Sequence, residues 1–216
     1  MHIIKRSLVI FLSALAFTGA AAGATLDDDV SKLQHEWERI KYQTAPAAQE
    51  KEFERLLQEA DQVLARNPER AEMLIWHGIV EGSYAGARGG LGALSHAKNA
   101  RKDFERALEI KPDALSGSAF TSLGSLYYQV PGWPIGFGDN KKALEFLKKG
   151  LAINPDGIDP NYFYGDFLYR IGDLDNAERT LRKALKAPAR PQRKLADEGR
   201  IGEINQLLEK IAEKRK

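Results

Sequence analysis

A set of small residues, large apolar residues and prolines recurs along this chain at long, nearly regular intervals. Successive sets lie 44, 43 and 34 residues apart, and a glycine precedes each of the last three sets: Gly78, Gly124 and Gly165. A helix hairpin cannot bury its apolar face alone, so a repeat of this length predicts hairpins that stack on one another. The aligned positions are Leu56, Ala60, Val63 and Pro68; Ala100, Phe104, Ala107 and Pro112; Ala143, Leu147, Gly150 and Pro155; and Ala177, Leu181 and Ala184.

Helical spacing of apolar residues runs through the whole chain, and no alternating stretch is long enough to predict a strand. Three of the predicted helices end at Asn67-Pro68, Lys111-Pro112 and Asn154-Pro155, because the residue before a proline resists the α conformation. The pattern predicts helices over residues 28–43, 48–66, 70–85, 95–110, 114–129, 140–153, 160–171, 174–186 and 195–214.

The first 24 residues have the composition of a secretory signal peptide. A basic start, MHIIKR, precedes a short apolar run, and Ala22-Gly23-Ala24 provides a small-residue cleavage site. Cleavage after Ala24 predicts a periplasmic or secreted protein with no stable membrane span. The rest of the chain divides into an N-terminal helix pair, a degenerate repeat, over 25–69; three hairpins over 70–188; and a capping helix over 189–216.

Charge and cysteine content narrow the range of partners and chemistry. The net charge is +2, and the predicted signal peptide contains Lys5 and Arg6 without an acidic residue, so the mature charge is 2 − 2 = 0. A neutral chain argues against nucleic acid as a partner, because phosphate binding needs clustered cations. The chain has no cysteine, which excludes disulfides, thiol nucleophiles and thiolate metal ligands.

The last copy, DPNYFYGDFLYRIGDLDNAERTLRKAL, is the most regular. Its Gly165, Gly172, Ala177 and Ala184 stand where a tetratricopeptide repeat has small residues, and this sequence resembles that class. The resemblance implies an all-α fold, a tetratricopeptide-like antiparallel helix-hairpin solenoid with a C-terminal capping helix. A generic helical bundle is the alternative, and it leaves the aligned features of three copies unexplained.

Two consecutive hairpins have longer turns than the last one. From the helix glycine to the next aligned alanine there are 12 residues in the last hairpin, 19 in the one before and 22 in the first. Turns of successive repeats lie along one edge of a solenoid, so the two enlarged turns, residues 83–96 and the stretch beginning VPGWPIGFGD, are expected side by side. Trp133 and Phe137 in the second turn either form the rim of a pocket or plug the helix stack.

The first helix of each hairpin is expected to line the concave face. That face combines aromatic and hydrogen-bonding side chains, which suit a peptide segment or a small organic ligand. The candidate binding residues are Tyr128, Tyr162, Asp166, Tyr169 and Arg170, beside Ile75, Ile79, Ser83, Thr121, Ser125 and Gln129. Arg88, next to flexible glycines, is a further candidate for meeting a carboxylate.

Catalytic, metal and cofactor motifs are not found. His77 and Glu81 lie one helical turn apart but have no third ligand at metal spacing. The GFGDN stretch lacks the preceding strand of a dinucleotide fingerprint, and Asp139 or Asn140 is better explained as a helix N-cap. We therefore expect a non-enzymatic protein without metal or cofactor.

The stretch SLGSLYYQVPGWPIGFGDNKKALEFLKKGLAINPDGIDPNYFYGDFLYRIGD carries a closer resemblance. It is similar to exported tetratricopeptide proteins related to the T component of tripartite ATP-independent periplasmic (TRAP) transporters, over roughly residues 70–188. The resemblance implies a periplasmic accessory protein that binds a small apolar or amphipathic ligand for a transporter partner. The alternative is a scaffold that binds a peptide or envelope protein on its concave face. The resemblance also implies a pocket-shaping loop made by Pro131, Gly132, Trp133, Gly136, Phe137 and Gly138.

Overall fold

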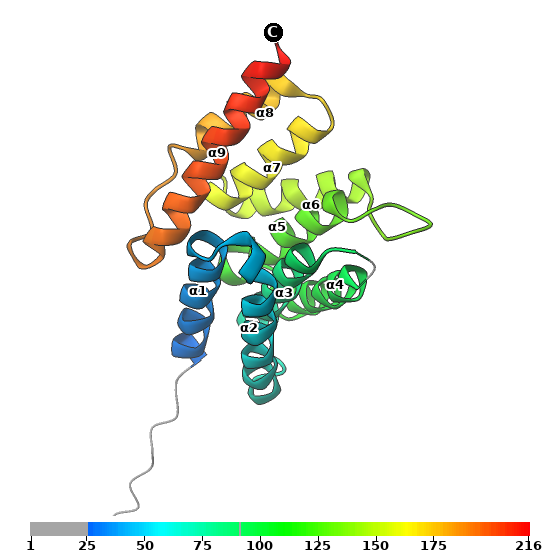
Figure 1. Ribbon diagram of the computed structural model, residues 1–216, viewed down its shortest axis with the longest axis vertical. Coiled ribbons are helices and arrows are strands. Elements are labelled where there is room, and N and C mark those ends of the chain that lie inside the picture. The colour runs from blue at the N-terminus through cyan, green and yellow to red at the C-terminus, as the bar shows by residue number, and fades with distance from the viewer. Residues whose placement is uncertain (1–25, 91) are drawn as a thin grey trace, which may run out of the picture.

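The computed structural model describes residues 26–90 and 92–216, and the expected signal peptide lies outside these ranges. Within them the chain is a series of α-helices with one short 3₁₀ turn, η1 (Pro191–Arg193), and no strand (Figure 1). The helices are α1 (Leu26–Gln43), α2 (Pro46–Arg66), α3 (Ala71–Arg88), α4 (Ala93–Ile110), α5 (Ala114–Gln129), α6 (Asn140–Ile153), α7 (Ile158–Arg170), α8 (Leu174–Ala184) and α9 (Lys194–Lys214). The helices predicted from the apolar spacing are confirmed, with ends that differ by a few residues.

The helices pack as consecutive antiparallel hairpins, and each hairpin packs on its neighbours. Helix α3 packs on α4, α5 on α6 and α7 on α8, while α2 also packs on α3. One core of buried side chains extends from α3 to α9, and a second lies between α1, α2 and α3. The expected all-α tetratricopeptide-like architecture is therefore confirmed.

The recurring glycines mark the places where the two helices of a hairpin are closest. A Cβ built on Gly78 would lie 2.7 Å from the ring of Phe104, and one on Gly124 would lie 2.6 Å from Leu147 Cγ. A Cβ on Gly165 would likewise lie 2.7 Å from Cγ of Leu181. These distances are far below ordinary carbon–carbon contacts, so only glycine fits. The same glycine-on-large-residue contact is thus repeated in three hairpins.

The first of the two enlarged turns is shorter than the sequence predicts, because its flanking helices extend into it. Only residues 89–92 lie between α3 and α4. Buried Tyr84 packs edge-on against His96, with ring centroids 4.6 Å apart, and Glu81 binds both His96 and Asn99. These contacts across the hairpin stabilise the added helical turns.

The second enlarged turn, residues 130–139, is a loop outside the helices and projects from the body of the molecule (Figure 1). It is followed by α6, whose first turn is capped by Asp139, which accepts hydrogen bonds from the backbone nitrogens of Lys141 and Lys142. The predicted N-cap is confirmed.

Helix α9 does more than cap the last hairpin. It packs on α7 and α8, and it also reaches α1 at the other end of the chain. A Cβ on Gly199 would lie 2.4 Å from the ring of Tyr42, so α9 crosses very close to the end of α1. The series of hairpins is thereby closed on one side.

Candidate functional site

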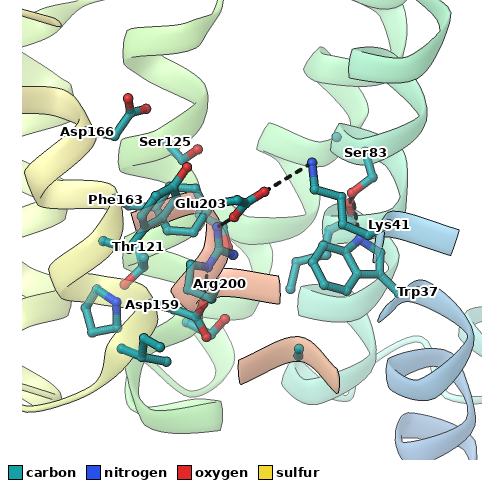
Figure 2. A pocket seen from close by; sticks show the side chains of 18 of the residues that line it. Trp37, Lys41, Ser83, Thr121, Ser125, Asp159, Phe163, Asp166, Arg200 and Glu203 are labelled. Carbon is teal, nitrogen blue, oxygen red and sulfur yellow. Dashed lines mark hydrogen bonds and ion pairs between the residues drawn. The ribbon is translucent and has the colours of Figure 1, made fainter. Parts of the chain in front are cut away.

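A cavity of about 1040 Å³ lies between α1, α3, α5, α7 and α9. Figure 2 shows side chains of α1 and α3 on one side of it, side chains of α5 and α7 on the other, and Arg200 and Glu203 of α9 between them. Its volume is slightly larger than the range of about 300–1,000 Å³ found for small-molecule sites. The first helices of the three hairpins, α3, α5 and α7, all contribute to its lining, and these are the helices on which the sequence analysis placed most of the candidate binding residues.

Two facing walls of the cavity differ in chemistry. The wall from α3 consists mainly of small residues at helical spacing, and the wall from α5 presents hydroxyl and amide groups. Small residues on α3 leave room for a ligand, while the polar groups of α5 offer hydrogen bonds. The α3 wall is Trp76, Gly78, Ile79, Gly82, Ser83, Gly86 and Ala87, and the α5 wall is Leu115, Ser116, Ser118, Thr121, Ser122, Ser125, Leu126 and Gln129.

Polar contacts between α1 and the C-terminal segment close the cavity. Glu38 accepts a hydrogen bond from the backbone nitrogen of Ala196 at 3.0 Å. Lys41 forms an ion pair with Glu203 at 3.5 Å (Figure 2). The Tyr42 hydroxyl donates a hydrogen bond to the same carboxylate at 3.4 Å. These contacts join segments that lie about 160 residues apart in the sequence and make α9 a wall of the cavity.

Charged side chains at the α7–α9 side form a connected network. Arg200 donates to Asp159 at 2.9 Å and to Glu203 at 2.6 Å, and Arg190 also donates to Asp159, at 2.8 Å. Burial raises the pKa of Asp159, but the charges of Arg200 and Arg190 outweigh that effect and hold it below its usual value. Burial also raises the pKa of Tyr162 to about 12, so its phenol stays neutral at physiological pH.

Comparison with known proteins agrees with this architecture. Residues 135–194 match the sequence model of the tetratricopeptide repeat. Among solved structures, TTC0263, a thermophilic tetratricopeptide-repeat protein of Thermus thermophilus, has a TM-score of 0.56 at 20% identity. The match covers 86% of this chain and 89% of that one. This chain folds as a tetratricopeptide-like solenoid. A solenoid of this class is a protein-interaction or binding module.

A second structural relative is more distant. MamA from Desulfovibrio magneticus RS-1, residue 41 to the end, has a TM-score of 0.43 at 17% identity, covering 84% of this chain and 96% of that one. No curated protein matches the sequence.

Several predicted binding residues meet where α5 and α7 of the solenoid adjoin. The Tyr128 hydroxyl donates to Asp166 at 2.8 Å, and Arg170 Nε donates to the same carboxylate at 3.1 Å. The Arg170 guanidinium also lies 5.2 Å from the Tyr128 ring centroid. Asp166, Arg170 and Tyr162 line the cavity, whereas Tyr128 holds Asp166 in place.

The other predicted binding residues do not line the cavity. Trp133 is 89% exposed at the end of the projecting loop, and Phe137 packs edge-on against Tyr127 at the base of that loop. Arg88 donates to the Tyr84 hydroxyl, and the Tyr169 ring lies 4.1 Å from Lys214 Nζ. Among the companion residues, Ile79, Ser83, Thr121, Ser125 and Gln129 line the cavity, while Ile75 is fully buried in the core.

Residues that the sequence did not single out form much of the site. Trp37 lines the cavity from α1 and donates a hydrogen bond to Ser83 Oγ at 2.8 Å. Arg200 and Glu203 contribute from α9. Their signal in the sequence is weak, because an arginine or glutamate within a C-terminal helix is usually solvated. Only the return of α9 to α1 brings them to the cavity.

His77 lies outside the cavity, between two carboxylates. Its Nε2 is 2.9 Å from Asp61 and its Nδ1 is 2.7 Å from Asp103. Burial lowers the pKa of His77, but the hydrogen bonds and charges of Asp103 and Asp61 outweigh it and raise the pKa to about 9. Within residues 26–90 and 92–216, no group of three potential ligands could hold a metal ion.

A raised pKa makes His77 a pH-dependent source of stability. Its contribution is complete below the unfolded pKa of about 6.5 and disappears as the pH rises through 9. We expect the free energy of unfolding to fall by about 2 kcal/mol between those pH values. This is less than the pKa shift of His77 alone would give, because Asp61 is exposed and water screens its charge. Urea unfolding at several pH values measures this. His77→Gln should flatten the profile, and an unchanged slope would contradict the assignment.

Proposed function

We propose that this chain is an exported, non-enzymatic binding protein whose central cavity holds a small amphipathic ligand. The supporting observation is the cavity itself, with small residues on the α3 wall, hydroxyl groups on the α5 wall and α9 closed against α1. An amphipathic molecule would place its apolar part against Ile79 and Ala87 and its polar part against Ser118 and Ser122.

The cellular role follows from the resemblance to proteins related to the TRAP transporter T component. In the proposed role the protein works in the periplasm and supplies the ligand to a transporter partner. No helix in the described ranges is both long and apolar enough to cross a membrane.

A matched pair of glycine substitutions tests ligand binding in the cavity. A Cβ on Gly86, which lines the cavity, or on Gly202 of α9, which does not, would meet no atom within 4 Å. Gly86→Leu should lower ligand affinity about tenfold, because overlap with the ligand costs about 1.4 kcal/mol or more. Gly202→Leu should leave affinity unchanged.

Native mass spectrometry of the chain purified from cells that export it gives the readout. A bound small molecule, retained in Gly202→Leu and depleted in Gly86→Leu, is the expected result. Equal occupancy in the two variants would place the ligand outside the cavity. Absence of any bound mass, with no thermal shift across a panel of amphipathic metabolites, would contradict the proposal.

An extended peptide is the second candidate ligand. The hydroxyl and amide groups of Ser118, Ser122 and Gln129 could bond to a peptide backbone, and α9 blocks a folded domain from entering between α1 and α7. The mass measured in the same experiment separates a peptide from a small molecule. A peptide mass depleted by Gly86→Leu would favour the scaffold function over ligand delivery.

A further inference from the structure

The loop between α5 and α6 carries the most exposed large apolar side chains of the described residues. Trp133 is 89% exposed and Ile135 is 64% exposed, with Pro131 and Pro134 exposed beside them. We call residues 131–135 the tip. Figure 1 shows this loop standing clear of the helices. Neither Trp133 nor Ile135 lines the central cavity, so the proposed ligand-binding function does not account for them.

The tip is held in a fixed shape by its own backbone. Gly136 N donates to Gly132 O at 3.0 Å, and Gly138 N donates to Pro131 O at 2.9 Å. A Cβ on Gly138 would lie 1.9 Å from the Val130 carbonyl oxygen, so the two ends of the loop are in close backbone contact. A shape that exists before binding costs little conformational entropy when a partner is bound. Exposure of Trp133 is therefore a property of the folded state.

Cations surround the base of the loop. The Arg101 guanidinium lies 4.6 Å from the Phe137 ring centroid, and Lys142 Nζ lies 5.3 Å from the Tyr127 ring centroid. Lys141 and Lys142 follow the loop directly and are exposed. Three carboxylates lie nearby: Asp139 caps α6, Glu105 pairs with Arg101 at 3.6 Å, and Glu145 pairs with Lys149, which leaves Lys141 and Lys142 as the cations of the base. An apolar tip above a basic base is complementary to a surface with anionic headgroups over hydrocarbon.

The size and residue types of the tip favour a lipid surface over a protein. A stable protein interface buries about 800 Å² on each partner and engages 20–30 residues or so, whereas the tip offers two large apolar side chains at the end of a narrow projection. Tryptophan is enriched at membrane–water interfaces, where its ring sits among the headgroups. We propose that the tip inserts into the interfacial layer of an anionic lipid membrane and attaches the protein to it reversibly.

Quenching of tryptophan fluorescence by lipids with brominated acyl chains tests this on the full chain. Trp37 and Trp76 are buried in the fold and line the central cavity, so Trp133 is the tryptophan exposed to a lipid surface. We expect vesicles of phosphatidylglycerol and phosphatidylcholine to quench Trp133. A lipid held in the cavity could quench Trp37 or Trp76, so the signal assigned to the tip is the part that Trp133→Phe removes. Absence of quenching would overturn the proposal.

A matched pair of variants makes the test specific. Ile135→Asp places a carboxylate in the tip and should raise the lipid concentration for half-quenching about tenfold or more. Ile171→Asp makes the same change at a residue 48% exposed in the turn between α7 and α8, and it should behave as the wild type. Equal half-quenching in Ile135→Asp and the wild type would contradict insertion. A blue shift of Trp133 in lipid-free periplasmic extract but not with vesicles would assign the tip to a protein partner.

Discussion

Replacing Gly124 by Val is expected to lower the free energy of unfolding by about 3 kcal/mol, the upper end of the usual cost of overpacking. A Cβ at this position would lie 2.6 Å from Leu147 Cγ and 3.0 Å from the Leu147 backbone nitrogen. The side chain has little room to turn away, and the nitrogen can move only if α6 moves away from α5. Urea denaturation followed by circular dichroism gives the measurement.

A double-mutant cycle identifies the contact responsible. Leu147→Ala alone should cost about 2–5 kcal/mol, because it leaves a cavity in the core. The double variant should cost at least about 1 kcal/mol less than the sum, since the valine occupies space that the leucine vacates. Gly202→Val, on an open face of α9, should change stability by less than about 1 kcal/mol. If the cost of the double variant equalled the sum of the two single costs, the contact with Leu147 would not be the reason that glycine is needed at position 124.

This contact explains why so much of the fold could be predicted from the sequence. Spacing aligned the glycines at 78, 124 and 165 with one another, and Phe104, Leu147 and Leu181 with one another. The structure shows in addition that each glycine contacts the large residue of its own hairpin. Close approach of two helices leaves a local signal, because it permits only glycine on one side. The helix ends before proline have a local cause as well.

Other features depend on contacts that local sequence does not show. Leu115, Ser116 and Gly117 have φ angles of 47°, 58° and 74°, so the right-handed part of α5 begins only at residue 118. Left-handed backbone at Leu115 is unfavourable for a residue with a Cβ, and the sequence there reads as ordinary helix. The extension of α3 and α4 likewise depends on Tyr84 meeting His96 across the hairpin.

The candidate site was predicted in part for the same reason. Side chains of α3, α5 and α7, such as Ser83, Ser125 and Asp166, follow from helical periodicity once the hairpins are aligned, and they line the cavity. The contributions of α1 and α9 require knowledge of how the two ends of the chain meet. Trp133 was grouped with the binding residues because it is aromatic and lies in a loop, but which way a loop projects depends on its three-dimensional path.

Arg200 holds the closing helix in place, and Arg200→Met is expected to lower the free energy of unfolding by about 3 kcal/mol, near the lower end for breaking a buried ion pair. Its side chain is 9% exposed and is bonded to Asp159 and Glu203. Its guanidinium also lies 4.3 Å from the Tyr162 ring centroid. Methionine preserves much of the packing on that ring but leaves two carboxylates without their strongest partner. The cost is limited because Asp159 keeps Arg190 and Glu203 keeps Lys41.

Arg215→Met is the matched control, because Arg215 pairs with Asp175 and Glu178 at the exposed end of the same helix. Exposed pairs contribute little, so this variant should unfold like the wild type. Acid titration adds a second readout. The lowered pKa of Asp159 means that its stabilisation is present above the unfolded value, about 3.9, and is lost as the pH falls through the folded pKa. Arg200→Met should weaken that acid dependence, while Arg215→Met should preserve the part due to Asp159.

The free energy of unfolding and its acid dependence report on the Arg200 contacts, and amide exchange shows whether these contacts hold α9 against the cavity. Glu203 accepts a hydrogen bond from Arg200 and contacts Lys41 and Tyr42 of α1. Arg200 also bonds to Asp159 of α7, so its loss weakens the packing of α9 on α7 close to the place where α9 contacts α1. Amide exchange in residues 194–203 should then rise in Arg200→Met relative to Arg215→Met, while exchange in α3 and α4 stays the same. A uniform rise across all helices would mean that Arg200 supports the whole core and that α9 does not open separately.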